Sequence, residues 1–530
     1  MVNRWLTRAN SRLSLASAAS LLIGFSLFGQ ILGFVRTQVI NGSFNSLNHI
    51  TTDPYFAAFK IPDFFFYTIA AGALGVAFMP FLVDRLNKGD KESVWKITSS
   101  LLNMLSIIMA FVGLLLLLFP SAFLYLVVRH NLSPQETHQA IVITRLIAFN
   151  PLLFAISGIL TAVQQTFGRF FFFAIGPIIY NSCIIGSVYL FRNNIGLEGL
   201  GIGAVAGAVA QLLIVLFGLV GTGFHYHRRI YWKLEGFKGV LHNLVPRSID
   251  QGLDPLNSIV ETGRAATLQT GSITIYENAY TLHLAPILLI GTTISTAAFP
   301  RLNERLASGR TDLFRRDFKM ILRAMIWIIL PIAAVTYFTR SYLARLIFKS
   351  QAPEGIAAVL GLLVIAIIFR TLYAIISRYF YAYKDTRTPL YVSIFTIALN
   401  IVLAFTLVRT SFKIEGLAIA QSIVAAVEVF ILLIIMVWRD HDLFDWEFWS
   451  GIIRVISVTG FTMLAAFLSA SFIQLNTGDK GFITLGAKFM AILIPTLFVH
   501  ILVSWALELE EVQPVIDKLK KLILRPIRIQ

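Results

Sequence analysis

Long apolar stretches recur along almost the whole chain, and they restrict its fold more than any other feature. A membrane-spanning helix takes about 20 mostly apolar residues, and fourteen stretches are long enough. Hydrophobic residues make up 57% of the 530 residues and charged residues only 14%, which excludes an ordinary soluble core. The sequence therefore predicts an all-α polytopic membrane protein. The fourteen windows are 14–40, 54–83, 97–128, 136–166, 170–191, 197–221, 240–269, 274–300, 318–338, 355–383, 388–409, 414–438, 451–474 and 481–507.

Basic residues are concentrated in alternate connections between these stretches. They run from Arg85 to Lys96, Arg228 to Lys238, Arg301 to Lys319 and Lys518 to Arg528, whereas the connection at 41–53 has none. By the positive-inside rule, this pattern places both termini in the cytoplasm, as an even number of helices requires. We therefore attribute the net charge of +16 to membrane topology and expect no nucleic-acid partner.

One connection departs from this rule. Arg340, Arg345 and Lys349 fall on the predicted outer side. Long basic side chains at helix ends can reach the membrane surface, and we interpret these three in that way.

An internal repeat runs through the chain. The segment AFMPFLVDRLNKG (77–89) matches AAFPRLNERLASG (297–309) at an offset of 220, and residues 196–210 match 413–427 at an offset of 217. The period covers six helices, an even number, so both copies have the same orientation in the membrane. Parallel repeats of this kind predict two six-helix lobes around a central cavity and transport by alternating access.

The repeat also predicts the division of the chain. The expected parts are a cytoplasmic segment at 1–13, an N-terminal lobe at 14–237, a C-terminal lobe at 238–440, two additional helices at 441–508, and a basic amphipathic tail at 509–530. We expect the tail to lie on the anionic inner leaflet. A retained first helix is favoured over a cleaved signal peptide because the apolar run is long and continues through Arg36.

Several ionisable residues fall within the predicted helices, mostly in the first two helices of each lobe. A charge at the bilayer centre costs at least about 2.5 kcal/mol, which indicates a polar cavity or ion pairing. Structural ion pairs are the alternative for any single residue. The bases suit an anionic ligand such as a phosphate, and the acids suit gating pairs or cation coupling. The candidate contacts of such an anionic ligand are Arg36, Lys60 and Arg264, and the candidate gating or coupling residues are Asp53, Asp63, Asp250, Asp254, Glu261 and Glu277.

No arrangement of residues in the sequence indicates an enzyme. There is no HExxH motif, phosphate-binding loop or cysteine-based metal site, and the single Cys183 lies in an apolar helix. We expect no catalytic residue, metal or cofactor. Coupling to Na⁺, to H⁺ or to the membrane potential is left open.

Four motifs resemble the MurJ (MviN) family, the lipid II flippases of the multidrug/oligosaccharidyl-lipid/polysaccharide exporter superfamily. They are GFVR (33–36), TDPYFAAFKIPD (52–63), GA-x-x-x-AF-x-P (72–80) and FYAYKDTRTP (380–389). The resemblance implies a transporter of the bacterial inner membrane. It would move an undecaprenyl-pyrophosphate-linked cell-wall precursor to the outer leaflet, with the last two helices forming a groove for the lipid tail. Other cell-wall synthesis proteins are an open class of partner.

Several basic residues of the family pattern are missing. Gln30, Phe66, Tyr67 and Thr281 stand where the resemblance leads us to expect arginines, and Ala71 replaces a glutamate. These arginines are associated with holding the pyrophosphate. The alternatives are therefore a flippase for another polyprenyl-linked glycan, or a cation or drug antiporter of the same superfamily. A membrane transferase and a non-transporting scaffold are more distant alternatives.

Overall fold

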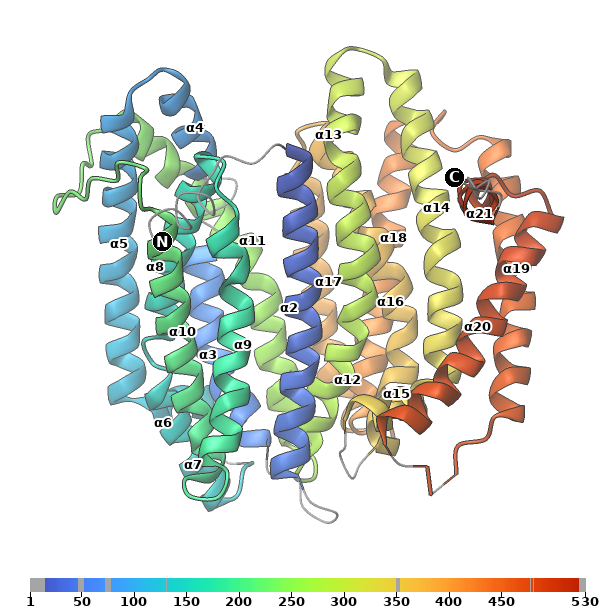
Figure 1. Ribbon diagram of the computed structural model, residues 1–530, viewed down its shortest axis with the longest axis horizontal. Coiled ribbons are helices and arrows are strands. Elements are labelled where there is room, and N and C mark those ends of the chain that lie inside the picture. The colour runs from blue at the N-terminus through green and yellow to red at the C-terminus, as the bar shows by residue number, and fades with distance from the viewer. Residues whose placement is uncertain are drawn as a thin grey trace, which may run out of the picture. The chain divides into compact units, whose positions relative to one another are not determined.

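Helices make up the regular structure that the computed structural model describes (Figure 1). The described residues are 15–45, 52–71, 78–129, 131–348, 353–476, 478–479 and 481–523. The predicted cytoplasmic segment at 1–13 lies outside them, as do residues 524–530 of the tail. The elements of the first part are α2 (Leu15–Phe44), α3 (Asp53–Phe65), η1 (Phe66–Ala71), α4 (Met79–Asn87), α5 (Lys91–Leu118), α6 (Pro120–Val128), α7 (Pro134–Leu146), α8 (Asn150–Thr166), α9 (Phe171–Phe191), η3 (Gly196–Glu198), α10 (Gly199–Gly218) and α11 (Glu235–Ala266).

The remaining elements continue in chain order to the tail. They are α12 (Ser272–Pro286), η4 (Ile287–Thr292), α13 (Thr293–Ala307), α14 (Thr311–Phe338), α15 (Arg340–Ile347), α16 (Pro353–Ala382), α17 (Arg387–Leu407), α18 (Glu415–Arg439), α19 (Trp446–Phe472), α20 (Phe482–Ala506), η5 (Glu510–Val512) and α21 (Gln513–Ile523).

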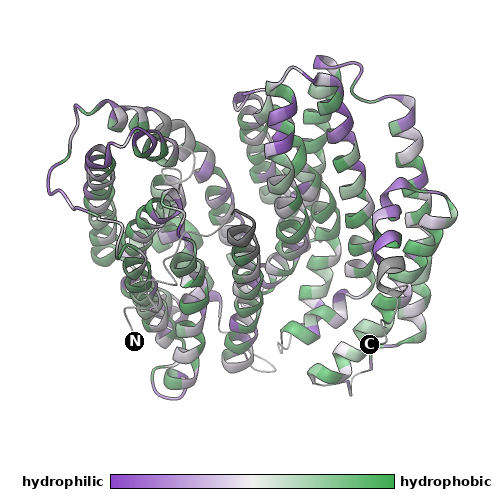
Figure 2. Ribbon diagram, turned by 45° about the horizontal axis from the view of Figure 1, so that its top comes forward, coloured by the Kyte–Doolittle hydropathy of each residue, from purple (hydrophilic) through white to green (hydrophobic). Residues whose placement is uncertain are grey.

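All fourteen predicted windows contain helix. Within the described residues, eleven helical stretches are long and apolar enough to cross a membrane, and Figure 2 shows the hydrophobic residues along them. The other three windows hold α2, the interrupted helix α3–η1–α4, and α11, which carries several charged residues. The prediction of an all-α polytopic membrane protein is confirmed.

The chain divides by its contacts into two compact units, Met1–Thr274 and Ile275–Gln530. This division falls later in the chain than the lobe boundary predicted at 237/238, because α11 packs on α3, α6 and η1. The contact is close: a Cβ added to Gly252 of α11 would lie 2.7 Å from the hydroxyl oxygen of Thr68 in η1.

The two units repeat each other in helix length and spacing. Helices α5 and α14 are both 28 residues long and begin 220 positions apart. Helices α9 and α17 are both 21 residues long and begin 216 positions apart. These offsets are close to the 220 and 217 read from the sequence, so the repeat is one of structure as well as of sequence.

The repeated sequence at 77–89 and 297–309 builds the same helix end twice. Gly89 and Gly309 have φ of +74° and +72°, which side chains with a Cβ rarely adopt. The N–H of Gly89 donates to the carbonyl of Leu86, and the next N–H donates to the carbonyl of Arg85. The second copy has the same two bonds. This is the Schellman motif, in which a glycine lets the last carbonyls of a helix be satisfied.

Each unit also contains one π-helical segment at a matching place. Segments η1 and η4 begin 221 positions apart, and η1 is described as far as Ala71. In each unit a glycine allows close contact at this segment, and a Cβ on Gly291 of η4 would lie 3.1 Å from the Cα of Thr371. The prolines and glycines in window 54–83 predict an interrupted helix. They do not predict that part of this helix is π-helical. Such segments are frequent at functional sites.

Within the second unit, α19 and α20 pack on α14. The indole N–H of Trp327 donates to the hydroxyl of Ser504 over 2.9 Å. The Arg323 guanidinium lies 2.6 Å from a carboxylate oxygen of Glu511, and both side chains are more than nine-tenths buried. Gly451 leaves room for the guanidinium, since a Cβ there would lie 2.7 Å from it. A buried ion pair therefore joins η5, which follows α20, to α14.

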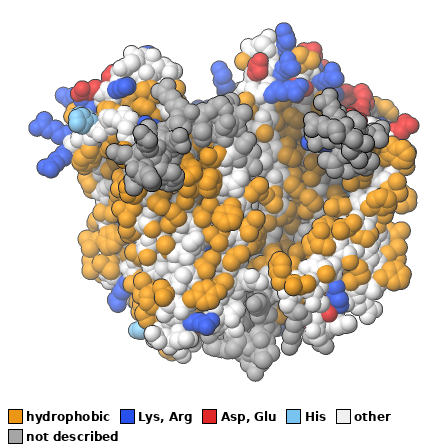
Figure 3. Space-filling view, in the orientation of Figure 1, with side chains coloured by type: hydrophobic (Ala, Val, Ile, Leu, Met, Phe, Trp, Pro, Cys, Tyr) orange, Lys and Arg blue, Asp and Glu red, His pale blue; other side chains and the backbone are white. Residues whose placement is uncertain are grey.

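Charged side chains gather at one end of the second unit, where α14 begins (Figure 3). Arg315 pairs with Asp440 over 2.6 Å, and Lys319 pairs with Asp445. Asp445 also caps the start of α19 by accepting from the N–H of Phe448. The hydrogen bond from Lys319 lowers the pKa of Asp445. Ion pairs thus join the start of α14 to the connection between α18 and α19.

Replacing Arg323 with leucine should destabilise the protein by about 3 kcal/mol or more, because it leaves the Glu511 carboxylate buried without its partner. The measurement is thermal unfolding of the purified protein in detergent. Arg316, exposed on the same helix, supplies the control, since Arg316→Leu should change stability by no more than about 0.5 kcal/mol. Equal effects of the two substitutions would contradict a specific role for the buried pair.

Candidate functional site

Asp53 begins α3, and its carboxylate is buried against the first residues of α12. One carboxylate oxygen accepts from the backbone N–H of Gly271 over 2.7 Å. The other accepts from the backbone N–H and the hydroxyl of Thr274, over 2.8 and 2.5 Å. The hydroxyls of Thr52 and Thr274 lie 2.9 Å apart. Asp53 therefore satisfies N–H groups at the start of a helix, where a negative charge is also favoured by the helix dipole.

Arg36 of α2 is fixed inside the first unit by a neutral partner. Its guanidinium donates to the side-chain oxygen of Asn181 in α9 over 3.0 Å. The Asn181 amide in turn donates to the carbonyl of Gly29. The Nε atom of Arg36 is buried without a hydrogen bond. Arg36 therefore has a neutral hydrogen-bond partner and one buried donor that is not satisfied.

Lys60 and Asp63 lie further along α3, about two helical turns or more after Asp53. The Lys60 ammonium donates to the hydroxyl of Ser258 in α11 over 2.8 Å. Asp63 is half-buried and lies close enough to Tyr55 and Tyr67 to interact with them electrostatically. Lys60 therefore contributes to the contact between α3 and α11, which are predicted to belong to different lobes.

The acidic candidates of α11 and α12 lie in different environments. Glu261 is buried, and its side chain accepts from the amide of Asn257 over 2.9 Å. Asp254 is exposed, Arg264 and Glu277 are half-buried, and the side chain of Asp250 lies outside the described residues. Their assignment to gating or ion coupling stays a prediction.

Tyrosines near Arg36 were not singled out in the sequence. Tyr55 and Tyr180 are both close enough to Arg36 and Asp63 to interact with them electrostatically. Tyr180 also packs against Phe154 with ring centroids 5.3 Å apart. Tyr55 lies within the TDPYF motif, so the sequence could have identified it as a site residue. Nothing in the sequence around Tyr180 links Tyr180 to Arg36. In the first unit, Arg36 thus lies near two tyrosine side chains.

The second unit has a buried ion pair of its own. Arg370 of α16 donates to the Glu428 carboxylate of α18 over 2.7 Å, and the hydroxyl of Ser393 donates to its other oxygen over 2.8 Å. Glu428 is buried, with an exposed fraction of 1%. This pair joins three helices. Glu428 is therefore fully engaged in packing within the second unit.

The FYAYKDTRTP motif forms the tight connection between α16 and α17. The Asp385 carboxylate accepts from the N–H groups of Arg387 and Thr388 and pairs with Arg439 over 2.6 Å. Burial of this carboxyl by itself raises its pKa, but the hydrogen bonds from Thr388 and Arg439 outweigh burial and lower the pKa to about 2. Asp385 therefore remains ionised at neutral pH and holds the start of α17 to the end of α18.

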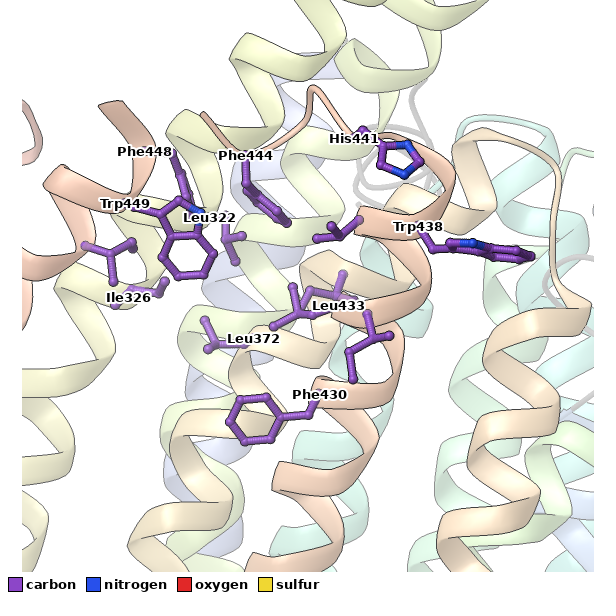
Figure 4. Close-up of a pocket in the computed structure, with 14 residues that line it drawn as sticks. Leu322, Ile326, Leu372, Phe430, Leu433, Trp438, His441, Phe444, Phe448 and Trp449 are labelled. Carbon is purple, nitrogen blue, oxygen red and sulfur yellow. The ribbon is translucent and has the colours of Figure 1, made fainter. Parts of the chain in front are cut away.

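An apolar groove with a volume of about 520 Å³ opens on the second unit (Figure 4). Helices α14, α16, α18 and α19 contribute its walls. Among the described residues that line it, those with a side-chain nitrogen are Trp438, His441 and Trp449. Of the two C-terminal helices from which the resemblance leads us to expect a lipid-tail groove, only α19 lines this one. The other lining residues are Leu322, Ile326, Leu372, Ile376, Phe430, Leu433, Ile434, Val437, Phe444, Phe448 and Ile452.

The chain matches the model of the family described as lipid II flippase MurJ over residues 48–507. A probable lipid II flippase MurJ of Thermotoga maritima is 23% identical over 514 residues, covering 94% of this chain and 98% of that protein. One of Borreliella burgdorferi is 22% identical over 420 residues, covering 78% of this chain and 82% of that protein.

Solved structures show the same fold at low sequence identity. A lipid II flippase MurJ in an inward closed conformation superposes with a TM-score of 0.75 at 19% identity, covering 92% of this chain and 99% of that one. An inward-facing multidrug resistance MATE family transporter of the MOP superfamily superposes with a TM-score of 0.67 at 15% identity. The match covers 78% of this chain and 95% of that one. This chain therefore has the same fold as these two proteins.

Replacing Asp53 with alanine should speed hydrogen exchange at the amides of Gly271 and Thr274 by about tenfold or more, because each amide loses a hydrogen bond to a charged acceptor. Exchange measured by mass spectrometry on a peptide covering the start of α12 reports this. The same peptide should be unchanged in Asp254→Ala, where an exposed carboxylate is removed. Unaltered protection in Asp53→Ala would show that the carboxylate does not hold this helix start.

Proposed function

Because the chain belongs to the MurJ family of lipid II flippases, we propose that it moves lipid II, an undecaprenyl-pyrophosphate-linked cell-wall precursor, from the inner to the outer leaflet. It acts as a transporter and not as an enzyme. The observation that carries this proposal in the structure is Arg36, a cation fixed by a neutral amide with a buried donor left unsatisfied. Arginine is suited to phosphate because its planar group offers several donors.

Arg36, Lys60 and Arg264 are the proposed contacts of the diphosphate. Lys60 and Arg264 lie on α3 and α11, which pack together in the first unit. Phe66 and Tyr67 lie in η1 at positions where the family resemblance leads us to expect arginines. Tyr67 is 45% exposed. Aromatic rings can stack on sugars, so η1 could contact the sugars of the headgroup. A different polyprenyl-linked glycan, with other sugars in its headgroup, is therefore the second candidate substrate.

Alternating access is the proposed mechanism, with the predicted lobes at 14–237 and 238–440 moving around a central cavity. Within the first unit, Asp53 holds Gly271 and Thr274, at the start of α12, to the start of α3. We propose that this contact breaks when the central cavity opens at these helix starts. Coupling to Na⁺, to H⁺ or to the membrane potential would act through the other acids, namely Asp63, Asp250, Asp254, Glu261 and Glu277.

The apolar groove of the second unit is the proposed site for the isoprenoid tail. Its lining is hydrocarbon and aromatic, and it opens on the surface of helices that cross the membrane. A polyprenyl chain is the apolar part of the substrate and would remain in contact with lipid while the headgroup crosses. In this arrangement the protein encloses only the headgroup, and the isoprenoid tail stays outside the central cavity.

The proposed location is the bacterial inner membrane, with both termini in the cytoplasm. The alternation of basic connections supports this orientation. The tail, which includes α21, would lie on the anionic inner leaflet. Other cell-wall synthesis proteins are the proposed class of protein partner, since they make and consume the same lipid-linked precursor.

Charge reversal at Arg36 should abolish the ability of the protein to support growth of a bacterium depleted of its own lipid II flippase, because a carboxylate repels the diphosphate. Arg264→Glu should act in the same way. Arg192→Glu, at an exposed residue that follows α9, is the control and should support growth. Expression of each variant in the membrane fraction is measured in parallel.

Two results would count against this proposal in different ways. Growth supported by Arg36→Glu would refute the diphosphate role of this arginine. Failure of the unaltered protein to support growth, when it is present in the membrane, would favour a different lipid-linked substrate.

Filling the groove should weaken its interaction with the tail. We expect Leu433→Trp to at least halve the yield of a photo-cross-link between the second unit and a polyprenyl diphosphate that carries a photoreactive group on its chain. Ile423→Trp changes an exposed residue of the same helix that does not line the groove, and it should leave the yield unaltered. Cross-links that are insensitive to Leu433→Trp would place the tail elsewhere.

A further inference from the structure

A second pocket, of about 480 Å³, lies at the far end of α14 from the cluster of basic residues. Its lining includes Phe338, Arg340, Arg345, Glu354 and Leu475. The 28 residues of α14 span about 42 Å at the usual helical rise, which exceeds the roughly 30 Å hydrocarbon core of a bilayer. The two ends of α14 therefore reach opposite membrane surfaces. By the positive-inside rule, this pocket lies at the outer one.

The internal repeat shows that the two arginines are not required by the fold. Helix α6 occupies the place of α15 in the first unit, 220 positions earlier. It has Pro120 and Tyr125 at the places of Arg340 and Arg345, and no charged residue at all. A helix of this kind therefore forms without the arginines, so their presence in the second unit calls for another explanation.

Both arginines donate to backbone carbonyls, and Arg345 also lies close enough to the Asp479 carboxylate to interact with it electrostatically. A terminal nitrogen of Arg340 donates to the carbonyl of Tyr337 over 2.7 Å, and the guanidinium lies 4.5 Å from the Tyr337 ring centroid. The stem of Arg340 passes Gly361, where a Cβ would lie 2.9 Å from Cδ. Arg345 donates to the carbonyl of Asn476 over 3.1 Å. Each guanidinium has further N–H donors available for a ligand.

Glu354 adds a negative charge to the same pocket. It lies in the first turn of α16 and is exposed, and it has no ion-pair partner among the residues that the structure describes. A simple anion would meet the arginines but would be repelled by Glu354. A ligand with a negative and a positive group satisfies all three side chains.

We propose that this pocket binds the headgroup of a zwitterionic phospholipid that carries a primary ammonium, such as phosphatidylethanolamine. Arg340 and Arg345 would bind its phosphate and Glu354 its ammonium, while Phe338 and Leu475 offer apolar contact to the glycerol and upper chains. Arginine is well suited to phosphate because its planar guanidinium can donate two parallel hydrogen bonds to phosphate oxygens. This inference concerns a resident lipid and is independent of the transported substrate.

Native mass spectrometry of the detergent-purified protein, titrated with defined lipids, tests the proposal. The unaltered protein should retain phosphatidylethanolamine in preference to phosphatidylglycerol and phosphatidylcholine. Arg340→Gln and Arg345→Gln should each weaken retention by about tenfold, the loss expected for charge-assisted hydrogen bonds. Arg409→Gln, at an exposed arginine on the same predicted side, is the control and should have no effect.

Glu354→Gln provides the sharper result. It should weaken binding of phosphatidylethanolamine and strengthen binding of phosphatidylglycerol, so that the preference between the two falls or reverses. An unchanged preference in this variant would overturn the proposal, as would an equal loss in Arg409→Gln. Displacement of the lipid by millimolar inorganic phosphate would show that the site takes a phosphate alone, which also contradicts it. Arg340→Lys, which keeps the charge, should retain part of the binding and exclude a folding defect.

Discussion

The Asp53 carboxylate is the interaction on which the proposed mechanism most depends. A buried ionised carboxylate is costly unless hydrogen bonds replace its water. Here Gly271, just before α12, and Thr274 in its first turn supply three donors, two backbone N–H groups and one hydroxyl. The same bonds satisfy backbone groups that a helix start leaves without partners. The hydrogen bonds therefore offset both the cost of burying the carboxylate and the cost of leaving these N–H groups without partners. A movement that separates Asp53 from the start of α12 restores both costs.

The two units share what the fold requires and differ where function is proposed. They share the Schellman motifs at Gly89 and Gly309, the paired lengths of their helices, and a π-helical segment in the second helix. The first unit places Arg36 among tyrosines, whereas the second holds the Arg370–Glu428 pair, the apolar groove and the outer pocket. A duplicated fold can keep its backbone architecture while its side chains diverge, since backbone hydrogen bonds satisfy the helices in both copies.

Several features could be read from the sequence because they depend on local chemistry. The length of an apolar stretch predicts a membrane-spanning helix. The repeated RL-x-x-G pattern predicts a helix end, because Gly89 and Gly309 adopt a positive φ there. Other features depend on residues far apart in the chain. The partner of Arg36 lies 145 positions away and that of Lys60 lies 198 positions away. No spacing rule relates such pairs, so Asn181 and Ser258 were not foreseen.

By itself, the sequence determined the class of the protein, its helices, its repeat and its family. These follow from hydrophobic length, from the spacing of prolines and glycines, and from motifs that each occupy a few consecutive residues. The tertiary structure alone decided which charges are held by neutral groups, which are ion-paired, and that α11 packs on the first unit. The reason is physical: the cost of a charge inside a membrane protein depends on the groups that surround it, and folding brings those groups together from distant parts of the chain.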